Sequence, residues 1–350
     1  MNRYPDKLNA AVLFELNKPL KIINIDIPSL KRGQILVKVI YSSICRSQLM
    51  EQAGGRGEDR WLPHLLGHEG SGIVVGIGSG VKRFKLNDKV ILTWIKTNGI
   101  ESKPISYKYK NKVINAGKVT TFSNYSIVSE NRLTKMPKTL DFARATLFGC
   151  ALPTGAGMVL NQVRPNKVDS VVIIGFGGIG ISAYMMLKAL KIKNIIVIDK
   201  DKKKLKFAKE LGVKNIYNGS DNYLIKKIIN KTKGGASYCI ESAGFAKTIE
   251  LGFSLINNTK GKLYFASHPA QDENISINPH ELIQGKQIFG TWGGSVNPDK
   301  DIKTINTMIK DKFDLMLFFS KIYDLKNINI ALKDMKKNNV LRPLIKMHHD

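Results

Sequence analysis

One stretch of the sequence decides the fold: Ser170-Val171-Val172-Ile173-Ile174-Gly175-Phe176-Gly177-Gly178-Ile179-Gly180. Its first five residues form a short apolar run of the kind expected for a buried strand. Glycines then follow at the spacing GxGxxG, and the apolar residues as far as Leu190 predict a helix. Gly175 permits a tight turn, Gly177 lets the backbone approach a pyrophosphate, and Gly180 lets the helix pack closely on the strand. The stretch therefore predicts a dinucleotide-binding strand–turn–helix unit.

The residues around this turn indicate which dinucleotide binds. Free N–H groups at the start of a helix attract a pyrophosphate, so Gly178 and Ile179 are expected to contact it together with the glycines. The next predicted strand ends at Asp199, about 20 residues further on, where a carboxylate accepts the ribose 2′-hydroxyl. This carboxylate repels a 2′-phosphate and favours NAD over NADP, although Lys200 beside it weakens the discrimination. An FAD site and a turn that has lost its cofactor are the alternatives.

The remaining patterns place this unit in an α/β protein of two domains. The first half is β-rich, with predicted strands at 35–41, 72–78 and 89–92. From about residue 153, short apolar runs alternate with helical patterns, which predicts a doubly wound parallel sheet covered on both faces. We expect a cofactor domain at 153–292, inserted in a discontinuous catalytic domain made of 1–152 and 293–350. The chain from about 295 is predicted to be helical and to end in a short extended segment, 342–346.

Composition narrows the class of protein further. The chain has 350 residues and 43% hydrophobic residues, enough for two sizeable cores. No apolar run approaches the roughly 18 residues that span a bilayer, and the N-terminus lacks the apolar stretch of a signal peptide. Three cysteines are too few for a disulfide framework. These features predict a cytoplasmic protein with no membrane partner.

The net charge of +27 is the most unusual number in the composition. Such a balance is typical of proteins that bind nucleic acid, acidic membranes or anionic substrates. The lysines are, however, spread along the chain, and lysine, asparagine and isoleucine are all abundant, as an AT-rich genome would produce. The densest run, 202–206, begins a predicted helix and is interpreted as a solvated face. We therefore expect no nucleic-acid partner.

Three residues far apart in the sequence have the chemistry of metal ligands. Cys45 follows a predicted strand, His68 lies in the glycine-rich loop Leu66-Gly67-His68-Glu69-Gly70, and Cys150 lies just before the cofactor domain. Two of the remaining candidates are interpreted differently: Cys239 lies on an apolar strand and is expected to be a small buried hydrophobe, and His64 lacks a comparable context. Two thiolates and an imidazole suit zinc. Three protein ligands leave one tetrahedral position open, which is typical of a catalytic ion.

These segments and the glycine turn together resemble the zinc-containing medium-chain dehydrogenase family, to which the alcohol dehydrogenases belong. The resemblance covers essentially the whole chain and extends to 290–294 and to 340–345. It implies a β-rich GroES-like catalytic domain beside a Rossmann cofactor domain. It also implies one chemistry, which is hydride transfer between NAD(H) and an alcohol, aldehyde or ketone beside a catalytic zinc ion.

The resemblance also assigns roles to individual residues. Cys45, His68 and Cys150 are expected to hold the zinc, and Glu69 is expected to approach the metal during ligand exchange. Ser47 is expected to take the substrate proton. Residues expected to contact the cofactor or line the substrate pocket are Arg46 and Arg342 at the pyrophosphate, Thr154 near the nicotinamide, Lys204 as a further cofactor contact, and Trp94 as a pocket wall.

Three departures from the family pattern modify these expectations. No cysteine lies between Cys45 and Cys150, so the four-cysteine structural zinc lobe is absent and one zinc per subunit is predicted. Gln48 stands where many members have an aspartate that orients the histidine ligand, and such changes cost about 10–100-fold in metal affinity or activity. Met50 stands where simple alcohol dehydrogenases place the last histidine of a proton relay. The proton is then expected to leave through the cofactor ribose and water.

A glycine-rich loop at 51–61 bears on the substrate. Arg56 and Arg60 on this loop are able to hold a phosphate or carboxylate, which favours a polar or polyol-type substrate, including phosphorylated or nucleotide-linked polyols. The alternative is a solvated loop with internal Arg–Glu pairs.

Other activities and the oligomeric state also stay open. Glutathione-linked formaldehyde dehydrogenase activity, a zinc-free quinone reductase, and a non-catalytic basic binding or lens-crystallin-like protein are the competing interpretations. A homodimer formed through 288–292 is implied by the family, with a tetramer as the alternative.

Overall fold

The computed structural model describes residues 4–349 and divides them into two compact units. Unit 1 comprises the described residues up to Cys150, Asn297–Lys303 and the described residues from Asp314 onward. Unit 2 comprises Ala151–Val296 and Thr304–Phe313. The first boundary between the units lies after Cys150, two residues before the predicted one. The second lies after Val296, four residues beyond the predicted one. The segment Thr304–Phe313, expected in the catalytic domain, packs with unit 2.

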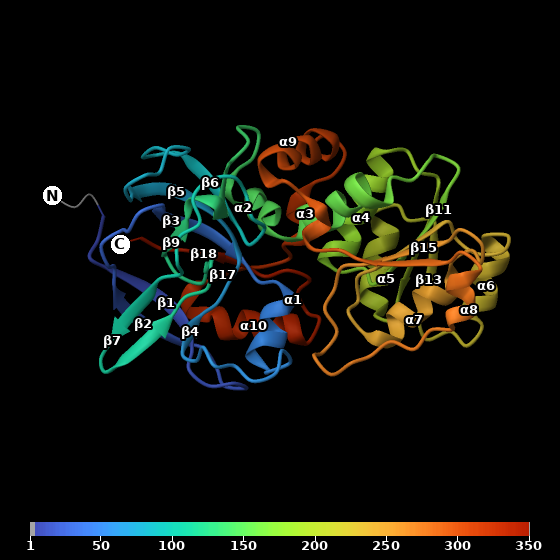
Figure 1. The fold of residues 1–350 in the computed structure, drawn as a ribbon, viewed down its shortest axis with the longest axis horizontal. Coiled ribbons are helices and arrows are strands. Elements are labelled where there is room, and N and C mark those ends of the chain that lie inside the picture. Colours follow the sequence, from blue (N-terminus) through green and yellow to red (C-terminus); the bar gives the residue numbers. More distant parts are fainter. Residues whose placement is uncertain (1–3, 350) are drawn as a thin grey trace. The chain divides into compact units, whose positions relative to one another are not determined.

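Unit 1 contains two sheets (Figure 1). The five-stranded sheet has the order β2-β1-β4-β8-β7 and consists of β1 (Lys7–Leu13), β2 (Lys21–Asp26), β4 (His64–Leu65), β7 (Ser106–Tyr109) and β8 (Lys112–Asn115). The seven-stranded sheet has the path β10-β6-β5-β3-β18-β17, with β9 also paired to β3. Its strands are β3 (Gln34–Ser43), β5 (Glu69–Ile77), β6 (Lys89–Thr93), β9 (Tyr125–Ser129), β10 (Leu133–Lys135), β17 (Ile322–Asp324) and β18 (Leu344–Lys346). The three strands predicted in this half correspond to β3, β5 and β6.

The β7–β8 hairpin lies in the segment where the sequence lacks the cysteines of a structural zinc lobe. Tyr107 and Ile114 face each other across the two strands, and both are almost completely buried. They belong to a hydrophobic cluster with residues of β1 and β2. Burial of apolar surface is worth about 25 cal/mol per Å², so a cluster of this kind stabilises the hairpin without a metal. A nearby carboxylate, Glu101, accepts ion pairs from Lys96, Lys118 and Arg132.

The C-terminal part of the chain corrects one prediction. The chain from about 295 was expected to be helical, and it does form α9 (Pro298–Ile309) and α10 (Ile328–Lys336). Between them, however, Ile322–Asp324 forms β17, which pairs in parallel with β18. Tyr323 of β17 is buried in the same core cluster as the apolar face of α10. The prediction of continuous helix was therefore wrong at this strand, because packing on β18 outweighed a weak local pattern.

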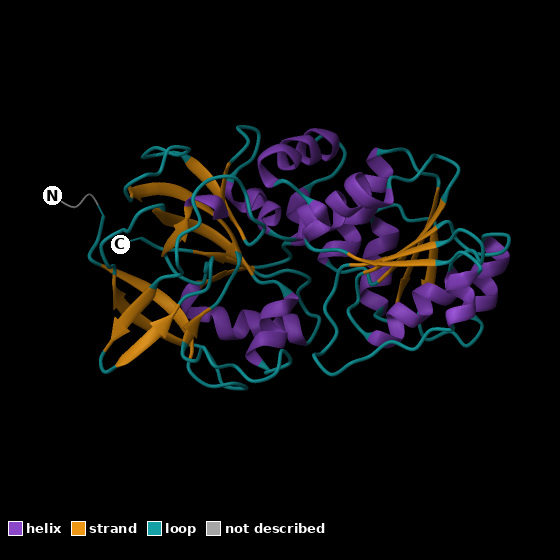
Figure 2. Cartoon of the chain, viewed as in Figure 1, coloured by secondary structure: helices purple, strands orange, loops and turns teal. Residues whose placement is uncertain are grey.

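Unit 2 is built around a six-stranded parallel sheet with the order β13-β12-β11-β14-β15-β16. Its strands are β11 (Ser170–Ile174), β12 (Asn194–Asp199), β13 (Asn215–Asn218), β14 (Tyr238–Glu241), β15 (Lys262–Phe265) and β16 (Gln287–Gly290). The helices of this unit are α3 (Ala151–Met158), α4 (Gly178–Ala189), α5 (Lys202–Glu210), α6 (Leu224–Lys231), α7 (Ala246–Leu255) and α8 (Pro279–Ile283). Figure 2 shows helices on both faces of the sheet, as the alternating sequence pattern predicts. This is the strand order of a dinucleotide-binding Rossmann domain.

The order in which successive strands are added to the sheet reverses between β11 and β14, which are parallel neighbours although far apart in sequence. Ligands of such sheets bind at the carboxyl ends of the strands beside this reversal. The predicted glycine turn lies there, since it joins β11 to α4. Among residues 4–349, none of the helices has both the length and the apolar character needed to cross a membrane.

Candidate functional site

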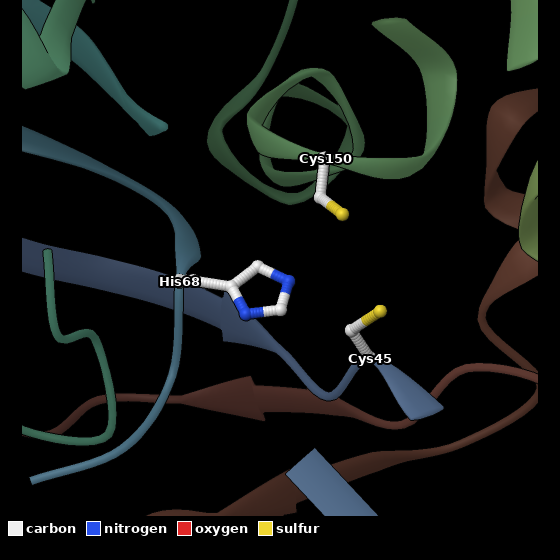
Figure 3. A group of neighbouring side chains, drawn as sticks. All are labelled: Cys45, His68 and Cys150. Atoms are coloured by element: carbon white, nitrogen blue, oxygen red, sulfur yellow. The ribbon is translucent and has the colours of Figure 1, made fainter. Parts of the chain in front are cut away.

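Cys45 is positioned by the junction between β3 and α1 (Arg46–Gln52). It is the residue that caps the helix, and its backbone N–H donates to the Oε1 atom of Gln48 at 2.8 Å. The preceding strand β3 is paired on both sides, with β5 and with β18, which fixes the position of its C-terminal end. Cys45 is half-buried, with its sulfur directed at the other two candidate ligands (Figure 3).

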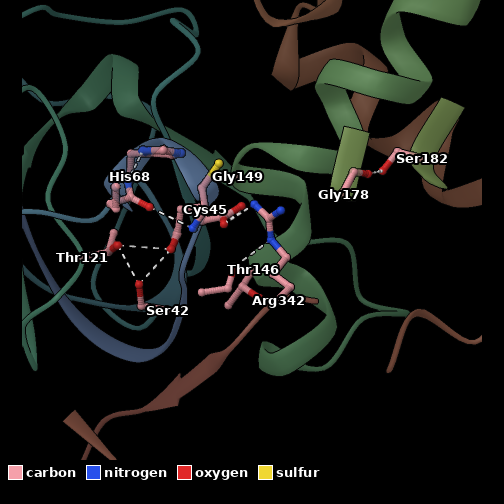
Figure 4. A network of polar contacts seen from close by, with 12 residues as sticks. Ser42, Cys45, His68, Thr121, Thr146, Gly149, Gly178, Ser182 and Arg342 are labelled. Carbon is pink, nitrogen blue, oxygen red and sulfur yellow. Dashed lines mark hydrogen bonds and ion pairs between the residues drawn. The ribbon is translucent and has the colours of Figure 1, made fainter. Parts of the chain in front are cut away.

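His68 lies on the turn that leads into β5, and glycine is required immediately before it. Gly67 has a φ of +88°, and a Cβ atom there would lie 2.5 Å from Oγ1 of Thr121. That same hydroxyl lies 2.7 Å from Oγ of Ser42, and both hydroxyls contact the carbonyl oxygen of Glu69 (Figure 4). The close approach of these segments fixes the backbone on both sides of His68.

Cys150 follows Gly149, where a second pair of backbone segments approach each other closely. A Cβ atom on Gly149 would lie 2.5 Å from the carbonyl oxygen of Leu92, so only glycine fits against the end of β6. The hydroxyl of Thr93 donates to the carbonyl of Gly149 at 2.9 Å. Cys150 itself is buried. Three separate segments of unit 1 thus deliver one ligand candidate each.

The three donor atoms form the only such group among the described residues. The sulfur atoms of Cys45 and Cys150 and a ring nitrogen of His68 all lie within 4.8 Å of one another. Figure 3 shows all three side chains turned toward a common point. Nε2 of His68 is buried and has no hydrogen-bond partner, which a bound cation would provide. This orphaned nitrogen and the sulfur-rich donor set fit zinc with a fourth position open.

The electrostatics of the cluster also favour a cation. A hydrogen bond from Cys150 holds the pKa of Cys45 well below its ordinary value, whereas the same bond raises the pKa of Cys150 well above it. The two sulfur atoms therefore share one proton. Burial opposes a charge on His68, but the neighbouring Cys45 thiolate outweighs this effect and raises the pKa of His68. A divalent ion that displaces these protons would gain two thiolate ligands.

Gln48 lies where the sequence predicted a histidine-orienting residue, with Nε2 in contact with Nδ1 of His68. Because its Oε1 accepts the N–H of Cys45, the amide presents a donor to Nδ1. Nδ1 must then act as an acceptor, which places the ring proton on Nε2, the nitrogen directed at the cysteines. A carboxylate presents oxygen to both partners and stabilises the opposite tautomer. Gln48 therefore disfavours the metal-binding form of His68 unless the amide turns over.

Glu69 and Arg342 form a buried ion pair behind the ligands. Nη2 of Arg342 contacts Oε1 of Glu69, and its Nε lies 3.4 Å from Oγ of Ser43. Burial raises the pKa of Glu69 even though Arg342 opposes the shift. Arg342 was predicted to contact the pyrophosphate, and in the structure its guanidinium is engaged with Glu69. Arg46, predicted for the same role, is exposed and bonds to Asn338 at 3.1 Å.

The other predicted residues of unit 1 lie on α1, on the loop that follows it, and after β6. Ser47 is the second residue of this helix, and its buried Oγ has no hydrogen-bond partner, which suits a group that exchanges a proton with a ligand. Trp94 follows β6, and its carbonyl accepts from Arg132 at 2.6 Å. Arg56 lies 3.9 Å from Glu51, and Arg60 lies over the ring of Trp61. Both arginines are thus partly engaged within their own loop, as the alternative interpretation expected.

In unit 2, Asp199 holds the glycine turn in place. Its Oδ2 accepts the N–H of Phe176 at 2.7 Å and its Oδ1 accepts that of Asp201 at 2.9 Å, while Nζ of Lys204 lies 3.7 Å from Oδ2.

The glycine turn itself is tightly packed. Gly175 has a φ of +87°, and Gly180 packs so closely that a Cβ atom there would lie 2.1 Å from the carbonyl oxygen of Gly175. The two glycines thus have the structural roles that the fingerprint assigns. Of the remaining predicted cofactor contacts, Gly177 caps α4, Gly178 and Ile179 begin that helix, and Thr154 is buried on α3.

Glu241, the last residue of β14, is a functional candidate that was not predicted from the sequence. Its Oε1 accepts from the N–H groups of Ala243 and Gly244 and from the hydroxyl of Thr248, at 2.7–2.8 Å. The same loop bonds to the glycine turn through Oγ of Ser242, which donates to the carbonyl of Gly175 at 2.7 Å. Glu241 is completely buried, and burial raises its pKa. Its position at the carboxyl end of a parallel strand was the available signal.

Comparison with known proteins gives matches to both units. The family model described as "Alcohol dehydrogenase GroES-like domain" matches residues 31–138, and the model described as "Zinc-binding dehydrogenase" matches residues 178–311. An S-(hydroxymethyl)glutathione dehydrogenase of Synechocystis is 28% identical over 97% of this chain and 99% of that protein. Alcohol dehydrogenase class-2 isozyme 2 of Oryctolagus cuniculus is 27% identical over 97% of both chains.

A solved structure shares the whole fold. Benzyl alcohol dehydrogenase of Acinetobacter calcoaceticus has a TM-score of 0.88 and 25% sequence identity, and the match covers 98% of this chain and 99% of the other. The predicted combination of a GroES-like domain with a Rossmann domain is confirmed by these matches.

Zinc affinity is expected to rise with pH, because Cys150 keeps its proton in the metal-free site until well above the ordinary thiol range. Binding must displace that proton, so the dissociation constant should fall about tenfold per pH unit while one proton is released per ion. Below the pKa of His68 the imidazolium proton must also leave, and the dependence should steepen. Competition with a fluorescent chelator between about pH 6 and pH 8 measures this. An affinity that does not change with pH would contradict the shared-proton description.

The variant Gln48→Glu should bind zinc about 10–100-fold more tightly than the unmodified protein, since a carboxylate accepts from both Cys45 N–H and Nδ1–H of His68. Gln48→Leu, which offers neither acceptor, serves as the matched control and should bind more weakly. The same chelator competition applies to all three proteins. Equal affinities for the Glu and Gln forms would show that Gln48 does not determine the tautomer of His68.

Proposed function

As the chain belongs to the zinc-binding medium-chain dehydrogenase family and is an NAD-dependent alcohol dehydrogenase or reductase, we propose that its substrate is a polar or polyol-type alcohol, or the matching carbonyl compound. Phosphorylated and nucleotide-linked polyols are included in this class. The observation that carries the chemistry is the cluster of Cys45, His68 and Cys150 with its orphaned imidazole nitrogen. Zinc held there acts as a Lewis acid that makes an alcohol oxygen more acidic.

The residues around the ligands handle charge and protons. The buried hydroxyl of Ser47, which has no hydrogen-bond partner in the structure, supports its proposed role as the acceptor of the substrate proton. Arg342 keeps a positive charge beside Glu69 and the two sulfur atoms, which limits the net negative charge of the site. Met50 follows on the same helix and offers no group that continues a proton relay. A bound cofactor would supply ribose hydroxyls, and solvent would supply water, as the next acceptor of a proton held by Ser47.

The substrate class is supported by two arginines on the loop that continues from α1. Arg56 is exposed, and its contact with Glu51 at 3.9 Å is long for an ion pair. Such exposed pairs contribute only about 0–1 kcal/mol, so an anionic group of a substrate displaces Glu51 at little cost. Arg60 is exposed as well. The helix that carries Ser47 thus leads directly into two cations that are available to a phosphate or carboxylate.

S-(hydroxymethyl)glutathione is a second candidate substrate. The observation in its favour is the match of 28% identity with a Synechocystis protein named for that activity. Its glutathione part carries carboxylates, which the same arginines can bind. Against it stands the absence of cysteines between Cys45 and Cys150, because the glutathione-linked branch generally keeps the structural zinc lobe.

NADH formation at about 340 nm, with and without a zinc chelator, tests the proposal and separates the candidates. The panel contains simple alcohols, S-(hydroxymethyl)glutathione, free polyols, and phosphorylated or nucleotide-linked polyols. We expect chelator-sensitive turnover that is highest with the polar or phosphorylated polyols. Turnover confined to simple apolar alcohols would contradict the proposed substrate class.

The double variant Arg56→Ala, Arg60→Ala provides the matched comparison. Loss of two charge-assisted contacts should lower kcat/KM for a phosphorylated substrate by about 10–100-fold, and should leave kcat/KM for a neutral polyol within about twofold. An unchanged kcat/KM for the phosphorylated substrate would exclude the arginines from substrate binding.

A homodimer through unit 2 is part of the proposal. The edge strand β16 pairs only with β15 among the described strands, so its outer edge is open. Exposed apolar side chains lie beside it, with 82% of Ile283 and 68% of Trp292 accessible. An open edge flanked by apolar residues favours pairing with a second copy about a twofold axis.

Replacing both flanking residues, Ile283→Lys and Trp292→Lys, should convert the dimer to a monomer, because buried lysines destabilise an apolar interface. Tyr223→Lys, just before α6, with Ile225→Lys on α6 is the matched control, since these residues are also exposed, by 69% and 47%. Light scattering coupled to gel filtration measures the mass of each protein. A dimer that survives the first pair of changes would place the interface elsewhere.

A further inference from the structure

The fold of unit 2 gathers lysines that are widely separated in the sequence. All six strands of its sheet are parallel, so their amino ends meet at one edge. The connections that lead into β11, β12, β13, β14 and β15 each carry at least one exposed lysine near that edge. We call these the amino-end lysines: Lys167, Lys191, Lys193, Lys214, Lys233 and Lys260.

The amino-end lysines have no counter-charge in the structure. Within residues 4–349, no carboxylate lies within ion-pair distance of any of them, in contrast to buried Lys286, which is paired with Glu281. Arg164 adds a further exposed cation before β11. Acidic groups are scarce in the same connections, with Asp169 as the exception. The lysines are spread along the sequence, and the sheet topology brings six of them to one edge.

Helix dipoles explain only part of this arrangement. The helices α4, α5 and α6 also end at this edge, and a cation in the last turn of a helix is stabilised by about 0.3–1 kcal/mol. Lys188, Lys209 and Lys231 occupy those last turns. The amino-end lysines lie beyond the helices, in the connections, where the dipole effect fades. The helix dipoles therefore do not compensate the charge of these lysines, and this edge of the sheet carries a net positive charge.

We propose that this edge binds the phosphate backbone of double-stranded nucleic acid, a function separate from the dehydrogenase activity. A row of flexible ammonium groups is complementary to a regular row of phosphates, and such contacts do not read sequence. Among the described residues, these connections expose only one large apolar side chain, that of Val168. Single-strand binding relies on exposed aromatic rings on which bases stack, and this edge offers none among the described residues. A duplex is therefore the favoured partner.

The dimensions of the edge agree with a duplex. The lysine-bearing connections lead into five adjacent strands about 4.8 Å apart, which extend over roughly 19 Å and correspond to about six base pairs at 3.4 Å each. Contacts of lysine with phosphate, without base readout, give dissociation constants of about 10⁻⁴–10⁻⁶ M at physiological salt. The expected interaction is weak, independent of sequence and strongly dependent on salt.

The proposed surface is at the opposite end of the strands from the cofactor turn. The glycine turn and Asp199 lie at the carboxyl ends of β11 and β12, and the amino-end lysines lie at the other ends of these strands. Binding at one edge therefore need not block the other. Changes at the lysines should leave dehydrogenase turnover unaltered, which separates this proposal from the proposed function.

Fluorescence anisotropy of the full chain with a labelled DNA duplex of about 20 base pairs tests the proposal. The variant Lys191→Gln, Lys193→Gln, Lys214→Gln removes three amino-end charges. The variant Lys18→Gln, Lys103→Gln, Lys108→Gln removes three exposed lysines of unit 1 and changes the net charge equally. We expect the first to bind at least about tenfold more weakly than the unmodified chain, and to reduce the slope of log K against log salt by about 2 to 3. The second should bind within about twofold of the unmodified chain.

Three results would overturn the proposal. One is an equal loss of affinity in both variants, since that would reflect net charge alone. Another is an absence of duplex binding even at low salt. The third is retention of the protein by phosphatidylserine vesicles, lost in the first variant, without duplex binding. Turnover of the alcohol substrate, measured in the same preparations, reports folding and tests the proposed function independently.

Discussion

The close approach of backbone segments at Gly67 and Gly149 is the constraint on which the site depends. A side chain at either position would collide with neighbouring atoms, and the segments that carry His68 and Cys150 would move apart. With glycine present, the turn before β5 and the end of β6 pack closely enough to bring three donor atoms within 4.8 Å of one another. Precise placement matters because metal affinity depends on ligand geometry that is fixed before the ion arrives.

Buried charge is the second determinant of the site. It arises because the close approach of the segments brings several ionisable side chains together in the core. Two cysteines and a glutamate that converge in a core would be costly if all were ionised. The structure reduces this cost in two ways, since one proton is shared between the sulfur atoms and Arg342 is brought to Glu69 from the far end of the chain. Removing one partner of such a buried pair leaves an uncompensated charge. The C-terminal strand β18, which positions Arg342, is thus tied to the electrostatics of the ligand site.

In unit 2 the parallel sheet separates two chemically different edges. At the carboxyl ends, the Asp199 carboxylate and the N-terminus of α4 surround a glycine turn, and Glu241 holds the adjoining loop. At the amino ends, lysines gather without acidic partners. The same topological rule produces both, because parallel strands place all their incoming connections at one edge and all their outgoing connections at the other. A proposal that the two edges serve different partners follows from this separation.

The sequence by itself determined the local features of the protein. Apolar runs and glycine spacing were sufficient to predict β11 and the last residues of α4 and β12 within one residue, and unusual local contexts identified Cys45, His68 and Cys150. These signals depend on neighbours in the chain. Tertiary structure alone decided what depends on distant residues. It placed Arg342 against Glu69 and put β17 where a helix was expected. It also brought six lysines together, since neither a contact across hundreds of residues nor the shared edge of a sheet leaves a periodic pattern in the sequence.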